Sequence, residues 1–272
     1  MTHIAFIGGG NMASSIIGGL LKQGDIQAKA ISVADPSLDQ RQHLETKFGV
    51  NTYKQGADAI KGASIIILAV KPQVMKAVLE PLKDALSQQQ PLLISIAAGI
   101  NLSSLKQWSG CRAIVRCMPN TPALLGLGAT GLTASADTNT EQRNNAESLL
   151  RAVGTTTWVN NEQQIDAVTA VSGSGPAYFF LLMEAMIQAG QQLGLSAEAA
   201  KQLTLNTALG ASQMALDSDV EIAELRRNVT SPGGTTEQAI LTFQQEGFND
   251  IVFDALEAAR NQAQKLSEQF GS

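Results

Sequence analysis

The first 160 residues alternate short apolar runs with stretches of helical periodicity. We expect strands at residues 3–7, 31–34, 64–70, 92–96, 112–116, 129–134 and 155–159. The third run is apolar almost throughout, which is typical of a parallel strand covered on both faces. Helices are expected after the first strand as far as Gly24 and again over residues 139–153, each ending at a glycine. This alternation predicts an α/β domain with a mostly parallel sheet.

The pattern changes after residue 160, where long helical segments replace the alternation. We expect helices at 176–193, 197–216, 220–229, 235–245 and 248–270, with a break at residues 172–175 and a loop at 217–219. The sequence therefore predicts two domains, an α/β domain over 1–160 and an all-α domain over 161–272. The helix that starts at Pro176 is apolar nearly all round as far as Ile187. Because so short a domain cannot surround such a helix, we expect it to pack against a second subunit.

A glycine-rich turn follows the first strand directly and opens the first helix. Its sequence, Gly8-Gly9-Gly10-Asn11-Met12-Ala13, fits the G-x-G-x-x-A pattern of dinucleotide-binding folds. Gly8 would allow the tight turn, and Gly10 would let the backbone approach a pyrophosphate. Ala13 replaces a third glycine and still permits close packing of helix and strand. The turn indicates a Rossmann-type N-terminal domain; the alternative is a glycine-rich turn in another α/β domain.

An acidic side chain stands at the end of the second strand. Asp35 lies 22 residues beyond Ala13, where a carboxylate usually binds the hydroxyls of the adenosine ribose. It would repel a 2′-phosphate and so favour NADH, whereas Arg41 lies close enough in sequence to accommodate that phosphate. The alternative for Asp35 is a turn residue before Pro36. At this stage the cofactor is NADPH or NADH, with the preference open.

Other polar groups gather where ligands bind parallel sheets, at the carboxyl ends of the strands. Lys71 follows the third strand and is either a cofactor-edge residue or a solvated lysine. The segment 97–99 follows the fourth strand at the same edge. The loop 117–122 contains two prolines and carries the amide of Asn120 and the hydroxyl of Thr121.

The segment 228–236 in the helical domain reads Asn-Val-Thr-Ser-Pro-Gly-Gly-Thr-Thr. It places four hydroxyls around a Pro-Gly-Gly break and precedes a predicted helix. We expect the backbone N–H groups of Gly233 and Gly234, together with the first turn of the helix, to be open to an anion. The alternative is a turn between helices with Thr235 or Thr236 as the N-cap.

Composition narrows the classes of function. Only 16% of the residues are charged, below the typical ~25%, which fits a surface partly buried against another subunit. The net charge of −5 and the lack of a basic cluster give no support for nucleic-acid binding. Uninterrupted apolar runs such as 65–70 are much shorter than the ~20 residues of a membrane span, so we expect no membrane partner.

Candidate chemistry is sparse outside these motifs. Cys111 and Cys117 form no CxxC pair, which favours a reducing, cytoplasmic location. His3 and His43 are the only histidines, and neither lies in a motif. This argues against an imidazole base and against a metal site.

Five segments together resemble the pyrroline-5-carboxylate reductase family, over essentially the whole chain. They are residues 7–13, 69–72, 116–122, 166–178 and 230–236. The first is shared by many dehydrogenases, whereas the last two together are specific. The resemblance implies hydride transfer from NAD(P)H to the C5 carbon of the cyclic imine 1-pyrroline-5-carboxylate, giving L-proline in the last step of proline biosynthesis. It also implies a dimer through the C-terminal helices, with a decameric ring of such dimers as a further assembly.

The resemblance and the motifs above together give the candidate site residues. Thr236 is the candidate catalytic residue, near the imine nitrogen. The candidate substrate-binding residues are Asn228, Ser231, Gly233, Gly234 and Thr235. The candidate cofactor-binding residues are Ile7, Gly8, Gly9, Gly10, Asn11, Met12, Asp35, Ala69, Val70, Lys71, Pro72 and Ala98. The chain departs from the family at Asp35, where NADPH-using members often carry a small hydroxyl or a basic neighbour, and at Gly56, where some relatives place an asparagine.

Two other interpretations remain open at this stage. A 3-hydroxyacid dehydrogenase or another imine reductase would share the two-domain plan. It would normally need a catalytic Lys or Asp in the interdomain helix, but residues 172–193 contain no lysine and only Glu184 as an acid. A nucleotide-binding relative without chemistry is the second alternative, and the intact hydroxyl-rich loop argues against it.

Overall fold

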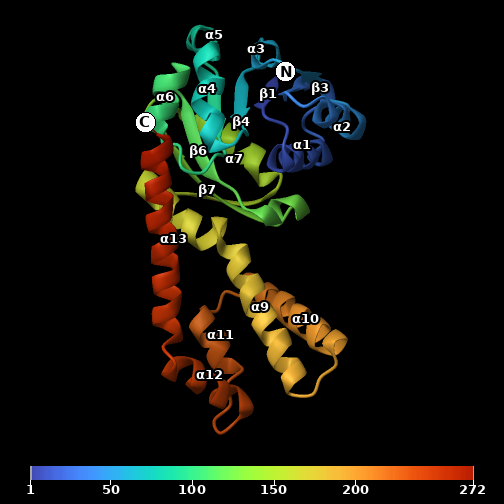
Figure 1. The fold of residues 1–272 in the computed structure, drawn as a ribbon, viewed down its shortest axis with the longest axis vertical. Coiled ribbons are helices and arrows are strands. Elements are labelled where there is room, and N and C mark those ends of the chain that lie inside the picture. Colours follow the sequence, from blue (N-terminus) through green and yellow to red (C-terminus); the bar gives the residue numbers. More distant parts are fainter. Residues whose placement is uncertain (1, 272) are drawn as a thin grey trace. The chain divides into compact units, whose positions relative to one another are not determined.

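The computed structural model describes residues 2–271 and divides into two compact units (Figure 1). The first unit runs up to Ser174 and takes in the chain from Ala258 onward; the second is Gly175–Glu257. The sequence-based division at residue 160 differs from this one at both ends of the helical region. The reason is that the segment after residue 160 and the end of the last helix both pack on the sheet-containing unit.

An eight-stranded sheet forms the centre of the first unit, in the order β3-β2-β1-β4-β5-β6-β7-β8. All neighbours pair in parallel except β6 and β7, so the predicted mostly parallel Rossmann-type sheet is confirmed. The strands are β1 (Ile4–Ile7), β2 (Ile31–Ala34), β3 (Asn51–Tyr53), β4 (Ile65–Leu68), β5 (Leu92–Ser95), β6 (Ile114–Met118), β7 (Gly128–Ala134) and β8 (Gly154–Trp158). The strand order reverses at β1, which places the ligand crevice beyond the carboxyl ends of β1 and β4.

Helices cover both faces of the sheet, and each face has its own core. Along β1, Ile4 and Phe6 join the core that contains α1 and α7, while Ala5 and Ile7 join the core that contains α4, α5 and α6. The helices of this unit are α1 (Asn11–Gln23), α2 (Leu38–Phe48), α3 (Gly56–Ala59), α4 (Met75–Leu79), α5 (Lys83–Gln89), α6 (Leu102–Ser109), α7 (Thr140–Arg151) and α8 (Glu162–Val168). Short 3₁₀ turns are η1 (Ala28–Ala30), η2 (Pro72–Val74), η3 (Glu80–Leu82) and η4 (Thr121–Leu125).

The predicted helix break at residues 172–175 is wrong. Thr169–Gly173 forms a π-helix, η5, and the amide of Ser174 donates to the carbonyl of Thr169 at 2.8 Å. The helical path therefore runs from α8 through η5 into α9 (Gly175–Gln192). By length and composition alone, the run Glu162–Gln192 could cross a membrane, although only 11% of its most apolar window is buried. This segment contains no long uninterrupted apolar run, so the length of such runs in the sequence did not reveal it.

The second unit is helical and exposes much apolar surface. It contains α9, α10 (Ala197–Leu216), α11 (Ile222–Asn228), α12 (Thr235–Gln245) and the first part of α13 (Phe248–Phe270). The exposed side chains of α9 include Phe179, Phe180 and Leu181, each at least 60% accessible. Burying a side chain of this size stabilises a protein by about 1.5–3 kcal/mol. Covering these exposed side chains would therefore stabilise the second unit considerably.

The end of α13 packs on the first unit. A Cβ at Gly99 would lie 3.1 Å from Cβ of Leu266, and Phe270 lies against the core beneath α6. The hydroxyl of Ser104 on α6 donates to the carbonyl of Gly271 at 2.5 Å. These contacts hold the end of α13 beside the segment that follows the carboxyl end of β5.

Candidate active site

The glycine-rich turn after β1 has the tight turn that the sequence predicted at Gly8. Gly8 has a φ of +98° and donates its N–H to the carbonyl of Ala34 at 2.8 Å. A Cβ at Gly8 would lie only 2.6 Å from the carbonyl oxygen of Ala69, so no larger residue fits. The turn thus brings the end of β1 against the first residue after β4.

Gly10 leaves open space at the N-terminus of α1. It is the N-cap without a side-chain cap, no acidic residue lies in the first turn, and a Cβ there would meet nothing within 4 Å. The backbone N–H groups of Asn11 and Met12 begin the helix and have no intrahelical partner. A pyrophosphate fits this open, positively polarised helix end.

Asp35 lies against the same turn. Its Oδ2 accepts the N–H of Gly9 and its Oδ1 accepts the N–H of Ser37, each at 2.9 Å. The carboxylate is therefore a turn residue that also bonds the glycine-rich turn, and its expected contact with the ribose hydroxyls stays a prediction. Gln40 also contacts this loop, since its Nε2 donates to the carbonyl of Gly9.

The residues after β4 and β5 line the same edge of the sheet. The register pairs Ile7 with Leu68 and Leu68 with Ser95, so Ala69, Val70 and Ala98 follow at the carboxyl ends. Lys71 is exposed, and Pro72 begins η2. The predicted cofactor residues from residue 7 to residue 98 thus gather at one edge. Gly56 is tightly packed, since a Cβ there would lie 3.1 Å from Cδ1 of Leu82.

Asn120 connects two of the motifs found in the sequence. Its Oδ1 accepts the N–H of Ala129 at 2.9 Å, and its Nδ2 donates to the carbonyl of Ser172 in η5 at 3.0 Å. A Cβ at Gly173 would lie 2.7 Å from Cε of Met118. The amide of Asn120 therefore fixes the loop after β6 against the π-helix.

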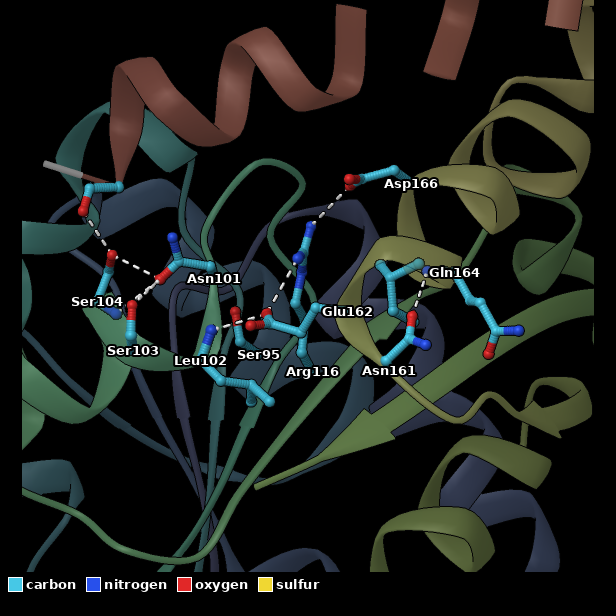
Figure 2. Close-up of polar contacts among 12 residues, drawn as sticks. Ser95, Asn101, Leu102, Ser103, Ser104, Arg116, Asn161, Glu162, Gln164 and Asp166 are labelled. Carbon is cyan, nitrogen blue, oxygen red and sulfur yellow. Dashed lines mark hydrogen bonds and ion pairs between the residues drawn. The ribbon is translucent and has the colours of Figure 1, made fainter. Parts of the chain in front are cut away.

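A buried ion cluster lies beneath this junction and was missed from the sequence (Figure 2). Arg116 of β6, whose side chain is 4% exposed, contacts Oε1 of Glu162 at 3.1 Å and Oδ1 of Asp166 at 3.5 Å. Glu162 also accepts the N–H of Leu102 at 2.8 Å and so links α8 to α6. Burial raises the pKa of Asp166, and the nearby Arg116 partly opposes that rise. An arginine within an apolar strand and two acids four residues apart were the available signals.

The loop before α12 differs from the expected anion site with open glycine N–H groups. The N–H of Gly233, which has a φ of +71°, donates to Oε2 of Glu237 at 2.7 Å, and the N–H of Gly234 donates to the carbonyl of Ser231 at 3.0 Å. Neither glycine amide is therefore free. Gly234 is the N-cap and makes no side-chain cap bond, so the alternative with Thr235 or Thr236 as N-cap is also wrong. The free donors are the N–H groups of the first helical turn, which starts at Thr235.

The hydroxyls of this loop separate into two kinds. Thr230 donates back to the carbonyl of Arg226 at 2.6 Å and serves the end of α11. In the described part of the chain, the hydroxyls of Ser231, Thr235 and Thr236 have no hydrogen-bond partner. Asn228 is the exposed last residue of α11. Three hydroxyls beside the N-terminus of α12 thus have no hydrogen-bond partner within the described residues.

Neither histidine lies in the loops described above, since His3 precedes β1 and His43 lies on α2. His3 contacts the hydroxyl of Ser32 at 2.9 Å at the amino end of the sheet, away from the ligand edge. Residues 2–271 contain no group of His, Cys, Asp and Glu side chains arranged to hold a metal ion.

Comparisons with known proteins agree with this arrangement. A family model described as pyrroline-5-carboxylate reductase dimerisation matches residues 162–266, and one described as NADP oxidoreductase, coenzyme F420-dependent, matches residues 3–99. The pyrroline-5-carboxylate reductase of Pseudomonas aeruginosa is 56% identical, with 99% of this chain and 98% of the relative aligned. That of Haemophilus influenzae is 44% identical, with 98% of each chain aligned.

Solved structures extend the comparison to the fold. A pyrroline-5-carboxylate reductase from Coxiella burnetii superimposes with a TM-score of 0.94 at 46% identity, over 98% of each chain. A pyrroline carboxylate reductase from Plasmodium falciparum with NADP bound gives 0.85 at 31% identity, again over 98% of each chain.

The apolar run Glu162–Gln192 falls within the segment matched by the dimerisation model, and its exposed side chains are those expected of a subunit contact. The protein is therefore a homo-oligomer that acts on a small molecule. Its sequence, fold and glycine-rich turn place the chain in the pyrroline-5-carboxylate reductase family, as an NAD(P)H-dependent oxidoreductase.

Proposed function

We propose that this protein reduces 1-pyrroline-5-carboxylate to L-proline with NAD(P)H, as the last step of proline biosynthesis. The observation that carries the proposal is the loop before α12, where three unpartnered hydroxyls border a helix N-terminus. It occurs in a chain that aligns over 99% of its length with a pyrroline-5-carboxylate reductase at 56% identity. A substrate with one carboxylate and one C=N bond matches those donors.

The first unit would hold the cofactor, which supplies the hydride. We assign the pyrophosphate to Gly10 and the start of α1, because a helix N-terminus with open space suits an anion. The turn from Ile7 to Met12 and the segment from Ala69 to Pro72 would line the nucleotide, with Ala98 at the end of β5. Asp35 would lie at the adenosine ribose.

The second unit would bind the substrate. We assign the carboxylate to the N–H groups of Thr235 and Thr236 and to the hydroxyl of Ser231, with Gly233 and Gly234 shaping the turn. Asn228 would border the same loop. Thr236 would hydrogen-bond the ring nitrogen and fix the imine for hydride addition, because orientation of the reacting atoms lowers the barrier by several kcal/mol. A threonine hydroxyl is a weak acid, so we propose water as the source of any proton.

We also propose the assembly and the location. Two chains would dimerise through the apolar helices of the second unit, and dimers would form a decameric ring. The cytoplasm is favoured because Cys111 and Cys117 are both buried free thiols. Burial raises the pKa of the Cys111 thiol, which keeps it in the unreactive protonated form.

Oxidation of NADH and NADPH in the presence of 1-pyrroline-5-carboxylate tests the function. We expect turnover with at least one cofactor and L-proline as the product by chromatography. The same assay in reverse with 3-hydroxyacids and NAD(P)⁺ addresses the competing dehydrogenase assignment. Turnover of a hydroxyacid without turnover of the imine would replace the proposal, and nucleotide binding without either activity would indicate a relative that has lost its chemistry.

A further inference from the structure

On the basis of the substrate site proposed above, we infer that Glu237 determines specificity by charge. Its carboxylate makes the loop before α12 disfavour ring carboxylates with a net negative charge, and favour those that also carry a cation on the ring nitrogen. The contact that points to this role lies within the loop itself. The N–H of Gly233 donates to Oε2 of Glu237 at 2.7 Å.

Glu237 does not form the usual cap of its helix. It is the third residue of α12, whose N-cap is Gly234. In a capping box, an acid at this position accepts the N–H of the N-cap residue. Here the N–H of Gly234 donates to the carbonyl of Ser231 at 3.0 Å, and Glu237 bonds instead to Gly233, one residue earlier. The carboxylate therefore lies against the turn where the substrate is proposed to bind.

The charge of Glu237 is not neutralised within the single chain. None of the ion pairs within residues 2–271 includes Glu237, and α12 contains neither lysine nor arginine. Two arginines lie in the last turn of α11. Arg227 pairs with Glu224, and Arg226 takes part in none of those ion pairs. The negative charge is therefore free to act on a ligand in the loop.

The charge lies close to the donors assigned to the substrate carboxylate. Those donors begin at Thr235, two residues after Gly233. Because consecutive Cα atoms are about 3.8 Å apart, the two residues lie within about 8 Å of each other. The Debye length at physiological ionic strength is also about 8 Å, so salt screens the interaction only in part. A ligand carboxylate would meet a like charge there, whereas a protonated ring nitrogen would meet an opposite one.

Movement of Glu237 would not remove the cost to an anion. Gly233 is exposed in the single chain, and a Cβ there would meet nothing within 4 Å, so the side chain has room to leave. Its departure would break a hydrogen bond to a carboxylate, which is among the stronger kinds. An anion therefore binds against either the repulsion or the broken bond. A cationic nitrogen offsets that cost by its attraction to Glu237.

This selection by charge bears on the proposed reaction. The imine of 1-pyrroline-5-carboxylate carries only the carboxylate charge until its nitrogen is protonated. Protonation makes the imine carbon more electron-poor and therefore a better acceptor of hydride. A site that disfavours the anion thus favours the form of the substrate that reacts more readily.

Binding of three ring compounds to the purified oligomer tests the inference without turnover. L-proline carries a carboxylate and a cation, cyclopentanecarboxylate carries only the carboxylate, and L-prolinamide carries only the cation. Ligand-observed NMR gives their dissociation constants, including weak ones. For the wild-type protein we expect L-proline to bind at least about fivefold more tightly than cyclopentanecarboxylate. The reverse order would overturn the inference.

Substitutions separate the charge of Glu237 from its hydrogen bond. Glu237→Gln keeps an acceptor for the N–H of Gly233 but removes the charge. It should tighten binding of cyclopentanecarboxylate at least about fivefold, weaken that of L-prolinamide at least about twofold and change that of L-proline less than about threefold. Glu237→Asp keeps the charge and should rank the ligands as the wild-type protein does. The matched control is Glu246→Gln, an exposed acid at the other end of α12, which should leave the ranking unchanged.

Salt dependence distinguishes this role from a helix cap. In 1 M sodium chloride the Debye length is about 3 Å, so the difference between the wild-type protein and Glu237→Gln should shrink. A residue that only caps α12 would change the melting temperature without changing the ranking of the ligands.

An unchanged ratio of the affinities for cyclopentanecarboxylate and L-proline in Glu237→Gln, or an equal change in Glu246→Gln, would overturn the inference. The same holds if none of the three compounds binds to a protein that reduces the imine. A protein that ranks the compounds as expected but does not reduce the imine would refute the proposed substrate and leave the role of Glu237 intact.

Discussion

Replacing Arg116 with methionine tests whether the buried ion cluster holds α8 and the π-helix on the sheet. Methionine fills a similar volume but removes the cation that faces Glu162 and Asp166. Removing one partner of a buried ion pair usually costs about 3–5 kcal/mol, because an uncompensated charge stays behind. Asp166 is 10% exposed and Glu162 is 31% exposed, so water can solvate one of the two carboxylates. We therefore take the lower end, about 3 kcal/mol.

This loss of stability should appear as a lower melting temperature, Tm. A change of 1 kcal/mol shifts the Tm of a domain of this size by about 2–4 °C, so Arg116→Met should lower it by about 6–12 °C. The matched control is Arg151→Met, because Arg151 pairs with Glu147 at 2.7 Å but is 63% exposed. An exposed pair contributes about 0–1 kcal/mol, so the control should shift far less. Calorimetry at one fixed protein concentration compares the two, since oligomer stability depends on concentration.

The pH dependence of the stability lost in Arg116→Met identifies the cause of that loss. The pKa of Asp166 is already raised in the folded protein by burial, and Arg116 opposes that rise. An acid whose folded pKa lies above its unfolded value destabilises the fold as pH rises through the window between the two values. Without Arg116 the pKa of Asp166 should rise further. The loss of stability in Arg116→Met should therefore be smaller at pH 4.5 than at pH 7. A deficit that equals the Arg151→Met control, or that does not shrink in acid, would refute this explanation.

Three further expectations concern the second unit. Thr236→Ala should reduce kcat more than about tenfold with folding intact by circular dichroism, whereas Thr242→Ala on the same helix should not; an unchanged kcat would remove Thr236 from the reaction. Glu237→Gln should lower KM for the imine about threefold, because it removes a negative charge bonded to Gly233 beside the proposed carboxylate site, and a raised KM would contradict that assignment. Phe180→Glu should produce monomers in light scattering, since Phe180 is 65% exposed in the single chain; a wild-type monomer at micromolar concentration would exclude the proposed dimer.

The parts of the fold that were predictable are those dictated by local pattern. The strand 64–70 is apolar on both faces, and β4 (Ile65–Leu68) is buried throughout. The glycine-rich turn was predictable from its glycines, because Gly8 has a positive φ and packs closely against Ala69, and only glycine tolerates both. In contrast, β3 was missed because its three residues, Asn51–Tyr53, are half-buried and largely polar. It forms a strand because it pairs with β2, and its own sequence does not indicate that pairing.

Other features depend on contacts that are distant in sequence. Arg116 meets acids 46 and 50 residues away, and no periodicity marks such a pair. The serines and glycines before Pro176 suggested a broken helix, but η5 continues with bonds that span five residues. Packing of Gly173 against Met118 and the bond from Asn120 to Ser172 hold that turn in place. Tertiary contacts thus override the local preference for a loop.

The two glycine-rich turns follow one physical rule that changes how each should be interpreted. In both, a glycine N–H is already bonded to a carboxylate of the chain itself: Gly9 to Asp35, and Gly233 to Glu237. An open backbone donor beside a helix N-terminus attracts the nearest anion, and a neighbouring acid is always present at high effective concentration. The glycines therefore provide space and unusual backbone angles, while the donors left for a ligand belong to the first turns of α1 and α12. The charge of each resident carboxylate then acts on whichever ligand approaches. That is why the acid beside each turn, rather than its glycines, is expected to set which ligand binds.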